Sequence, residues 1–439
     1  MPPVVPEFLR PLLDRPVAVL GGGVSGDGVC ALVRAVGGAA IVYDRKGGEA
    51  RTDFASADAA RHALVVFSPG FAVEHPWLQV ACAGGCLCLG ELDFASLFWP
   101  GRILAITGTN GKTTLTEFLT HALRTAGRRA VAVGNVGHSF SRAALDNPTP
   151  DTIAVCEVSS FQAETFRHFR AEATLWTNLA EDHLERHAGM GAYFDAKLRL
   201  VLCTPSGRFW AGSSVCAWAR RLGRALPGAA CLPTEGLPPD PRLAGTIFAE
   251  YPQRENFVLA EAWWRDRGLG PEILLDAARS FRLGRHRLAR VAEVGGVGYW
   301  NDSKATNFHA VHGALARFDR PVLLIAGGRA KGGDIRSFAA SLAGRVAHLL
   351  LLGETAEELA AGAAPAGIPL TRCESLETAV ERAAQLARPG DQVLLSPAFA
   401  SFDMFRNYED RGDRFEAAVR RLAAARPPLA TPPTQSLPS

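Results

Sequence analysis

The chain has 439 residues, of which 48% are hydrophobic and 21% charged, and its net charge is +3. At roughly 150 residues per domain, this length predicts about three domains with ample apolar material for their cores. A charge so close to zero gives no electrostatic case for nucleic-acid or membrane binding. No segment has the ~18 uncharged apolar residues of a membrane span, and the start, MPPVVPEFLRPLLDRP, does not resemble a signal peptide. We therefore expect a cytoplasmic protein without a membrane span.

The chain contains nine cysteines, and most of them lie in apolar runs: Cys30, Cys82, Cys86, Cys88, Cys156 and Cys203. No pair of C-x-x-C motifs occurs, so buried, reduced thiols are the favoured interpretation. A zinc site on Cys82, Cys86 and Cys88 is the weaker alternative, because no fourth ligand has a suitable spacing.

Residues 17–44 have the pattern of a β-strand, a helix and a second β-strand. Gly21, Gly23 and Gly26 form G-x-G-x-x-G after the first strand, and Asp44 follows the second strand. This pattern is typical of folds that bind a nucleotide phosphate at a helix N-terminus. On this segment alone, an NAD- or flavin-dependent enzyme is a real competitor. The strands expected in this part of the chain are 17–20, 40–43, 63–67 and 86–89.

The segment 102–114, RILAITGTNGKTT, has the layout of a phosphate-binding loop between a strand and a helix. Its glycines let backbone N–H groups converge on an anion at the helix N-terminus. Lys112 is placed to reach the β- and γ-phosphates, and the Thr113 hydroxyl is placed to ligate Mg²⁺. The full Walker pattern has glycine at the position of Ile106, so the generic match is incomplete.

A second doubly wound sheet is expected after residue 100, because short apolar runs alternate with helical stretches. Polar side chains follow these runs, among them Asn135, Glu157 and Asn178, and the helix that carries Lys197 comes after His183. A threonine of the phosphate loop, a carboxylate and an imidazole suit a hard cation beside ATP phosphates. The strands expected here are 103–107, 130–133, 153–156 and 174–177, and residues 204–250 carry little signal.

A third α/β sheet is expected from residue 282. Strands at 288–294 and 297–300 flank the turn Gly295-Gly296, and the stretch 301–307 is expected to open a helix. Further strands are expected at 322–325, 348–352 and 392–395. The sequence thus predicts three consecutive doubly wound α/β domains, Rossmann-like, P-loop ATPase-like and Rossmann-like. Their predicted ranges are 1–99, 100–281 and 282–425, followed by a disordered Pro/Ser/Thr-rich tail at 426–439.

Five stretches occur in the order GTNGKTT, CEVSSFQAE, TNLAEDHLERH, NDSKATN and SPAFASFDMFRNYEDRGDRF. With them, the chain resembles the Mur ligase family of peptidoglycan synthesis over roughly residues 17–425, and most of all its glutamate-adding member. The resemblance implies a monomeric cytoplasmic ligase that uses ATP and Mg²⁺. It would join glutamate to UDP-N-acetylmuramoyl-L-alanine through an acyl phosphate, with D-glutamate favoured over L-glutamate.

The resemblance also implies roles for individual residues. Catalysis would involve Lys112, Glu157, His183 and Lys197. ATP would be bound by Gly108, Thr109, Asn110, Gly111, Lys112, Thr113, Thr114, Asn256, Arg287, Asp302 and Lys304. The UDP substrate would be bound by Val24, Ser25, Asp44, Arg45, Gly70, Asn135 and His183. Glutamate would be bound by Thr306, Lys331, Ser401, Phe402 and Tyr408. The metal would be held by Thr113, Glu157, His183 and Lys197, the last as a carbamate formed with CO₂.

Two departures from the family pattern stand out. The family's adenine-contact motif H-N-x-x-N corresponds here to residues 255–259, where Glu255 and Leu259 replace the first and last residues and Asn256 is kept. Arg329 stands where the family often has an acid. These changes motivate a non-catalytic nucleotide-binding homologue as one alternative. A related ligase for another amino acid, or a folylpolyglutamate synthase, is the second alternative, and the dehydrogenase is the third.

Overall fold

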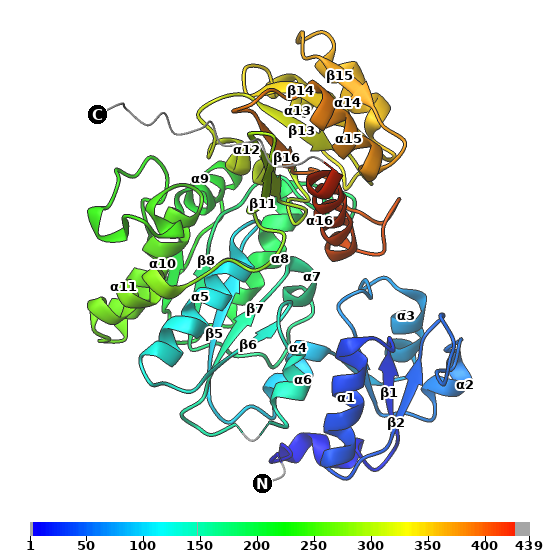
Figure 1. Cartoon of the computed structure of the whole chain (residues 1–439). Helices are drawn as coiled ribbons and strands as arrows, with labels where there is room; N and C mark the ends of the chain where they lie inside the picture. The colour runs from blue at the N-terminus through cyan, green and yellow to red at the C-terminus, as the bar shows by residue number, and fades with distance from the viewer. Residues whose placement is uncertain (1–2, 147, 426–439) are drawn as a thin grey trace, which may run out of the picture. The chain divides into compact units, whose positions relative to one another are not determined.

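The computed structural model describes residues 3–146 and 148–425, and it divides into two compact units (Figure 1). Among the described residues, the first unit comprises those up to 179 together with 188–281, and the second comprises 180–187 together with 282–425. Two of the three sheets lie in the first unit and the third lies in the second. The boundaries expected at 99 and 281 stay predictions, and the tail expected at 426–439 lies outside the described residues.

The first sheet has four parallel strands in the order β2-β1-β3-β4. Alternate residues of β1 face opposite sides, so Val17 and Val19 pack with helix α1 while Ala18 and Leu20 pack with Trp77 of α3. Helices therefore cover both faces, as the doubly wound prediction requires. The elements of this part are η1 (Glu7–Leu12), β1 (Val17–Leu20), α1 (Val24–Ala35), β2 (Ala40–Tyr43), α2 (Ser56–Ala59), β3 (Leu64–Phe67), α3 (Pro76–Ala83), β4 (Leu87–Gly90) and α4 (Glu91–Ser96).

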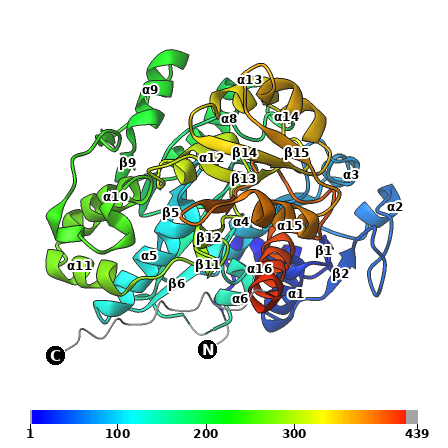
Figure 2. The same cartoon turned by 45° about the horizontal axis from the view of Figure 1, so that its top comes forward.

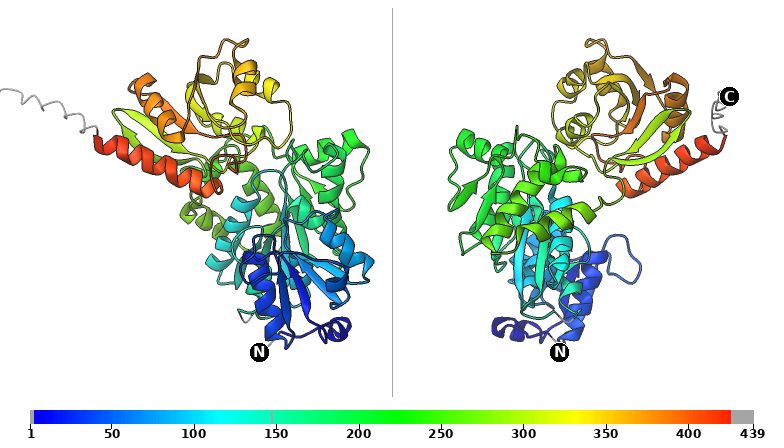
Figure 3. Two further views of the ribbon diagram at one scale, coloured as in Figure 1. Left: turned by 90° about the vertical axis from the view of Figure 1, so that its right-hand side faces the viewer. Right: turned by 60° about the vertical axis from the view of Figure 1, so that its left-hand side comes forward.

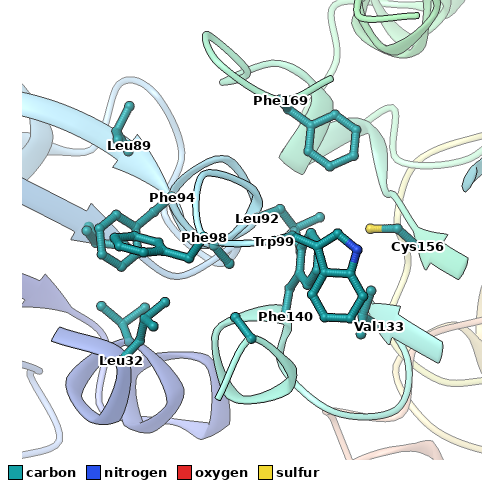
Figure 4. Packing of buried hydrophobic residues seen from close by; sticks show 14 of the residues in the cluster. Leu32, Leu89, Leu92, Phe94, Phe98, Trp99, Val133, Phe140, Cys156 and Phe169 are labelled. Atoms are coloured by element: carbon teal, nitrogen blue, oxygen red, sulfur yellow. The ribbon is translucent and has the colours of Figure 1, made fainter. Parts of the chain in front are cut away.

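One hydrophobic core joins the first sheet to the second, and α4 and the residues after it lie within that core (Figure 4). Trp99 packs against Phe140 with ring centroids 5.3 Å apart. Two buried acids of α4 reinforce the junction. The Glu91 carboxylate accepts the Ser141 N–H at 2.7 Å, and Asp93 accepts three backbone N–H groups of residues 167–169.

The second sheet has six parallel strands in the order β10-β9-β8-β5-β7-β6. On one face, Phe118 of α5 packs against Phe248, Phe257 and Phe281. The elements are β5 (Arg102–Thr107), α5 (Lys112–Thr125), β6 (Ala130–Gly134), α6 (Phe140–Ala143), β7 (Ile153–Glu157), α7 (Ser160–Ala163), β8 (Ala173–Trp176), α8 (Met190–Leu202), β9 (Phe209–Ala211), α9 (Ser213–Leu222), β10 (Ala229–Cys231), η2 (Pro241–Leu243), η3 (Ile247–Ala249), α10 (Gln253–Asp266) and α11 (Pro271–Ser280).

The prediction that the cysteines are all reduced thiols was wrong for one pair. Cys216 of α9 and Cys231 of β10 form a disulfide. The pair lies in the stretch 204–250, where strands of three residues gave no periodicity that would bring the two cysteines together. The zinc alternative also fails among the described residues, because no cluster of three or more potential ligands forms and the Cys86 thiol is directed to the Ala59 and His62 carbonyls.

The third sheet has six strands in the order β11-β12-β16-β13-β14-β15, with only β11 and β12 antiparallel. Gly295 and Gly296 join that pair with φ of 60° and 76°, which suits a tight hairpin turn. Helices α12, α13 and α14 cover one face, while α15 and the long α16 cover the other (Figures 2 and 3). The elements are β11 (Ala289–Val294), β12 (Val297–Asn301), α12 (Phe308–Leu315), β13 (Val322–Ala326), α13 (Ile335–Ser341), β14 (Val346–Leu351), α14 (Ala356–Ala363), β15 (Leu370–Arg372), α15 (Leu376–Leu386), β16 (Gln392–Leu395) and α16 (Tyr408–Ala425).

The stretch 301–307 leads into a helix, but the helix itself begins only after this stretch. Helix α12 begins at Phe308, and Asn307 is its N-cap, since its side chain accepts the Ala310 N–H at 2.9 Å. The preceding residues form a loop because their polar groups bind elsewhere, with the Asp302 carboxylate accepting the Leu288 N–H. Across the described part of the chain, no helix is both long enough and apolar enough to cross a membrane.

Candidate active site

The phosphate-binding loop lies between β5 and α5, as the sequence predicts. Gly111 precedes α5 with φ of 81°. A Cβ atom at Gly108 would lie 1.9 Å from the Thr177 hydroxyl oxygen, and one at Gly111 would lie 2.6 Å from the Asn256 carboxamide oxygen. Only glycine fits at either position, because the loop packs closely against its neighbours. The loop ends at the N-terminus of α5, where the first N–H groups of a helix can bind an anion.

The end of β8 holds this loop from the side. The Thr109 N–H donates to the Asn178 carbonyl at 3.0 Å, and the Asn110 N–H donates to the Asn178 side-chain oxygen at 2.8 Å. The Thr177 hydroxyl donates to the Asn110 carbonyl at 2.6 Å. The sequence shows that Asn178 follows a strand. Its hydrogen bonds to the loop, however, depend on the pairing of β8 with β5, which the sequence does not show.

Two lysines converge on the loop. Lys112 Nζ donates to the carbonyls of Gly108 and Thr109 at 3.0 and 2.8 Å. Lys197, which is only 1% exposed, donates to the same Gly108 carbonyl at 2.8 Å and lies over the Tyr193 ring. Two ammonium groups and a helix N-terminus therefore act on one small region, which suits a polyphosphate.

Glu157 ends β7, beside the loop-bearing strand β5, where it pairs with Ile106. One carboxylate oxygen accepts the Asn135 amide at 3.0 Å, while the other, Oε2, is buried without a hydrogen-bond partner. A buried carboxylate oxygen without a partner is a ready ligand for a hard cation. The residues around the loop therefore fit Mg²⁺, although within the described ranges no three His, Cys, Asp or Glu side chains cluster as a preformed metal site.

The second unit carries a separate polar cavity. Lys331 Nζ pairs with the Asp182 carboxylate at 2.8 Å and contacts the Thr306 hydroxyl at 3.4 Å. The Asn307 amide donates to Asp182 at 3.0 Å. Burial acts to raise the pKa of Asp182, but Lys331, His183 and Asn307 hold it below its usual value. The cavity is lined by Glu181, Asp182, Leu184, Thr306, Asn307, Phe308, Lys331, Gly332, Gly333, Ala398 and Phe399.

His183 lies in the second unit, whereas Thr113, Glu157 and Lys197 lie in the first. Its backbone is left-handed, with φ of 56°. Its Nδ1 is 3.3 Å from the Glu185 carboxylate, and its Nε2 is 3.7 Å from Asp182. The metal role expected for His183 together with Glu157 thus stays a prediction.

Of the residues expected to reach ATP from the third sheet, Asp302 and Lys304 lie on the loop after β12 and Arg287 lies just before β11. Asp302 accepts the Leu288 N–H at 3.1 Å and the Ser396 hydroxyl at 3.0 Å, and burial raises its pKa to about 7. Lys304 Nζ lies 3.8 Å from the centroid of the Tyr408 ring. Arg287 lies near Asp302 and acts to lower its pKa.

Arg411 has a role that the sequence did not reveal. It is fully buried, and its guanidinium donates to the Ser303 hydroxyl at 3.0 Å, to the Ser303 carbonyl at 2.9 Å and to the Phe399 carbonyl at 3.2 Å. It thereby ties the loop of Asp302 and Lys304 to the strand-end loop that lines the cavity. Of the other residues expected to bind glutamate, Ser401 is buried and Phe402 is 63% exposed, and neither lines the cavity.

The expected UDP site keeps its glycine turn. A Cβ atom at Gly26 would lie 1.9 Å from the Gly21 carbonyl oxygen, so the helix approaches the turn closely. Asp44 accepts the N–H groups of Gly22 and Lys46 at 2.7 and 2.9 Å, and these bonds hold its pKa below the usual value. Among the other residues expected there, Val24 is 75% exposed, Ser25 is half-buried, Asn135 and Gly70 are exposed, and the Arg45 guanidinium lies over the Trp77 ring.

Comparison with known proteins agrees with this architecture. Residues 106–211 match the Mur ligase middle domain, and residues 286–399 match the Mur ligase glutamate ligase domain. The chain is 36% identical over 426 residues to the UDP-N-acetylmuramoylalanine–D-glutamate ligase of Nitratidesulfovibrio vulgaris, covering 92% of this chain and 96% of that one. It is 33% identical to the protein of the same name from Caldanaerobacter subterraneus, over 94% of this chain and 99% of that one.

Solved structures share the fold at low identity. The UDP-N-acetylmuramate-alanine ligase MurC of Thermotoga maritima is 15% identical with a TM-score of 0.58, covering 94% of this chain and 100% of that one. The MurF ligase of Thermotoga maritima, solved in complex with ADP, is 16% identical with a TM-score of 0.57, covering 81% and 95%.

A phosphate-binding loop on one α/β sheet, in series with two further α/β sheets, defines the protein as a multidomain ATP-dependent ligase. The chain belongs to the Mur ligase family. Membership accounts for both the glycine turn at 21–26 and the phosphate loop, whereas the dehydrogenase alternative accounts only for the first.

Proposed function

We propose that the protein joins glutamate, in the D configuration, to UDP-N-acetylmuramoyl-L-alanine in the cytoplasm while converting ATP to ADP and phosphate. The observation that carries the proposal is the buried Glu157 oxygen without a hydrogen-bond partner, on the strand that pairs with the loop-bearing β5, together with Lys112 at the start of α5. The names of relatives that are 33–36% identical over more than 90% of the chain support the choice of substrates.

The chemistry requires activation of the alanyl carboxylate, which is a poor electrophile. Lys112 and the N-terminus of α5 offset negative charge as the γ-phosphoryl group passes to that carboxylate. Mg²⁺, when bound, would add charge neutralisation at the phosphates, and Thr113 and Glu157 would hold it. The amine of glutamate then attacks the acyl phosphate, and phosphate leaves.

Lys197 takes part in this proposal as a carbamate. Its ammonium group would first lose a proton, and the resulting amine would combine with CO₂ and release a second proton, which turns a cation into an anion able to ligate the metal with Glu157. Its burial supports a role beyond that of a solvated surface lysine, because a lysine is almost never fully buried without partners.

Lys331 is the proposed partner of a glutamate carboxylate, because an ammonium group at a polar cavity pairs naturally with that anion. The residues 332 and 333 that follow are glycines with φ of 84° and 91°, and both line the same cavity.

The test is a phosphate-release assay with ATP, Mg²⁺, UDP-N-acetylmuramoyl-L-alanine and a panel of L- and D-amino acids. We expect release only when the sugar-peptide and D-glutamate are both present. Turnover with L-glutamate or another amino acid alone would identify a different acceptor. A lack of turnover with every acceptor would favour the non-catalytic homologue.

A further inference from the structure

Glu255 is a buried acid next to the phosphate-binding loop. It lies in the first turn of α10 and is only 5% exposed. The Asn178 side chain faces its carboxyl group and acts to lower the pKa of that group, as a hydrogen-bond donor does. Because the Asn178 side-chain oxygen already accepts the Asn110 N–H at 2.8 Å, the NH₂ group of this amide is the one directed at Glu255.

The first turn of α10 thus contacts the loop at two points. Glu255 acts on Asn110 through Asn178, and the next residue, Asn256, lies directly against Gly111. Asn256 is fixed in turn, since its amide donates to Gln253 at 2.8 Å. Asn178 also accepts the Thr109 N–H through its backbone carbonyl, so one residue orients two successive N–H groups of the loop.

We propose that Glu255 is a positioning residue for the nucleotide, an inference that rests on the proposed use of ATP. In its neutral form, Glu255 fixes Asn178, and Asn178 in turn fixes the phosphate-binding loop. A neutral carboxyl group accepts the Asn178 amide through its C=O oxygen. It also places no negative charge beside a loop built to hold a triphosphate, where an anion in a buried site would be repelled strongly.

The surroundings of Glu255 support the neutral form. Burial, followed by the charge of Glu235, raises its pKa to about 7, and the bond from Asn178 acts in the opposite direction. Tyr251, in the turn before α10, is the other titratable group that faces it. A bound triphosphate adds negative charge and raises the pKa of Glu255 further. Nucleotide affinity should therefore fall as Glu255 ionises.

The experiment measures the dissociation constant for ATP with Mg²⁺ by equilibrium dialysis, and the KM and kcat of the ligase reaction, between pH 6.5 and 8.5. The variants are Glu255→Gln, which keeps a neutral acceptor, and Glu255→Ala, which removes it. Glu272→Gln, at an exposed acid of α11, is the matched control. Thermal melting of each variant shows whether it is folded.

We expect Glu255→Gln to bind ATP about as tightly as the wild type at pH 6.5. At pH 8.5 it should bind about 30-fold more tightly than the wild type, because a pKa of about 7 leaves only about 3% of Glu255 neutral at that pH. Glu255→Ala should bind about 10-fold more weakly than Glu255→Gln at every pH, with KM for ATP raised more than kcat is lowered. The Glu272→Gln control should follow the wild type throughout.

The inference is overturned if a folded Glu255→Ala variant binds ATP as tightly as Glu255→Gln does. It is also overturned if the ATP affinities of the wild type and of Glu255→Gln depend on pH in the same way. A wild type that binds no ATP at any pH would instead overturn the proposed function, so the two failures are distinguishable. If Glu255→Ala does not fold, the pH comparison between the wild type and Glu255→Gln decides alone.

Discussion

Lys112 and Lys197 donate to the same atom, the carbonyl oxygen of Gly108, at 3.0 and 2.8 Å. They reach it from different elements, Lys112 from the start of α5 and Lys197 from the middle of α8. Lys112 lies in the phosphate-loop motif itself, whereas Lys197 is brought to the loop only by the packing of α8.

Replacing Lys197 by alanine should abolish ligase activity, with a loss of at least 100-fold in kcat. If the working form is a carbamate, short-chain carboxylic acids such as acetate should restore part of the activity by supplying an anion in the vacated space. The measurement is phosphate release with increasing acid concentration. Lys112→Ala is the control, because its missing cation should not be replaced by an acid. Full activity of Lys197→Ala without added acid would remove the carbamate from the mechanism.

Asp182 pairs with Lys331, the proposed partner of a glutamate carboxylate. Asp182→Asn keeps the shape but removes the charge that pairs with Lys331 at 2.8 Å. We expect KM for glutamate to rise about 10-fold, since a charged hydrogen bond contributes about 1.5–3 kcal/mol, while KM for ATP changes less than 2-fold. Steady-state kinetics with each substrate varied separately would measure both. Arg329→Ala, which breaks an exposed pair with Glu354, should change neither constant. Equal increases in the two KM values would argue against a role specific to the glutamate cavity.

Sequence reasoning placed most strands correctly because their signal is local. Val17–Leu20, Ala40–Tyr43 and Gln392–Leu395 are short runs made up mainly of apolar residues, and the structure has strands at those bounds. The short strands β9 and β10 could not be placed within residues 204–250, and β15 was missed, because three residues carry no usable period and their formation depends on a neighbouring strand.

The site was predictable in part for the same reason. Residues of the phosphate loop form one contiguous motif, so their proximity follows from the sequence. Asn178, Asp182 and Arg411 act on partners far along the chain, with Arg411 more than 100 residues from Ser303. Only the packing of the sheets brings such pairs together, and no local sequence pattern predicts these contacts.

Arg411→Ala should destabilise the second unit by about 3 kcal/mol, because it removes a buried guanidinium and leaves the Ser303 and Phe399 carbonyls without their donor. Thermal melting would measure the loss. Activity should fall as well, and added guanidinium should restore part of it if the cavity accepts the free ion. Arg420→Ala, at an exposed position of the same helix, should change stability by less than about 0.5 kcal/mol. A normally stable Arg411→Ala variant would show that the two loops hold each other without it.

Burial of Asp302 makes the free energy of unfolding depend on pH, and it fixes the sign of that dependence. Its pKa is raised to about 7 in the folded protein, above the ordinary value of 3.8. The folded state therefore holds this proton more tightly than the unfolded state does. The stability that depends on it is complete below pH 3.8 and is lost as pH rises toward 7. Asp302→Asn cannot ionise, so its free energy of unfolding relative to the wild type should rise over this range, by up to about 4 kcal/mol.

Melting temperatures of the wild type and Asp302→Asn between pH 4.5 and 8 would measure this difference. Asp319→Asn, at an exposed aspartate of the same unit, should follow the wild type at every pH. The comparison must be made as a difference between variants, because burial raises the pKa of Glu91, Asp93 and Glu255 as well and these groups give the wild type a slope of the same sign. A constant difference between wild type and Asp302→Asn across the range would mean that Asp302 stays ionised in the folded protein, held by the Leu288 N–H and the Ser396 hydroxyl.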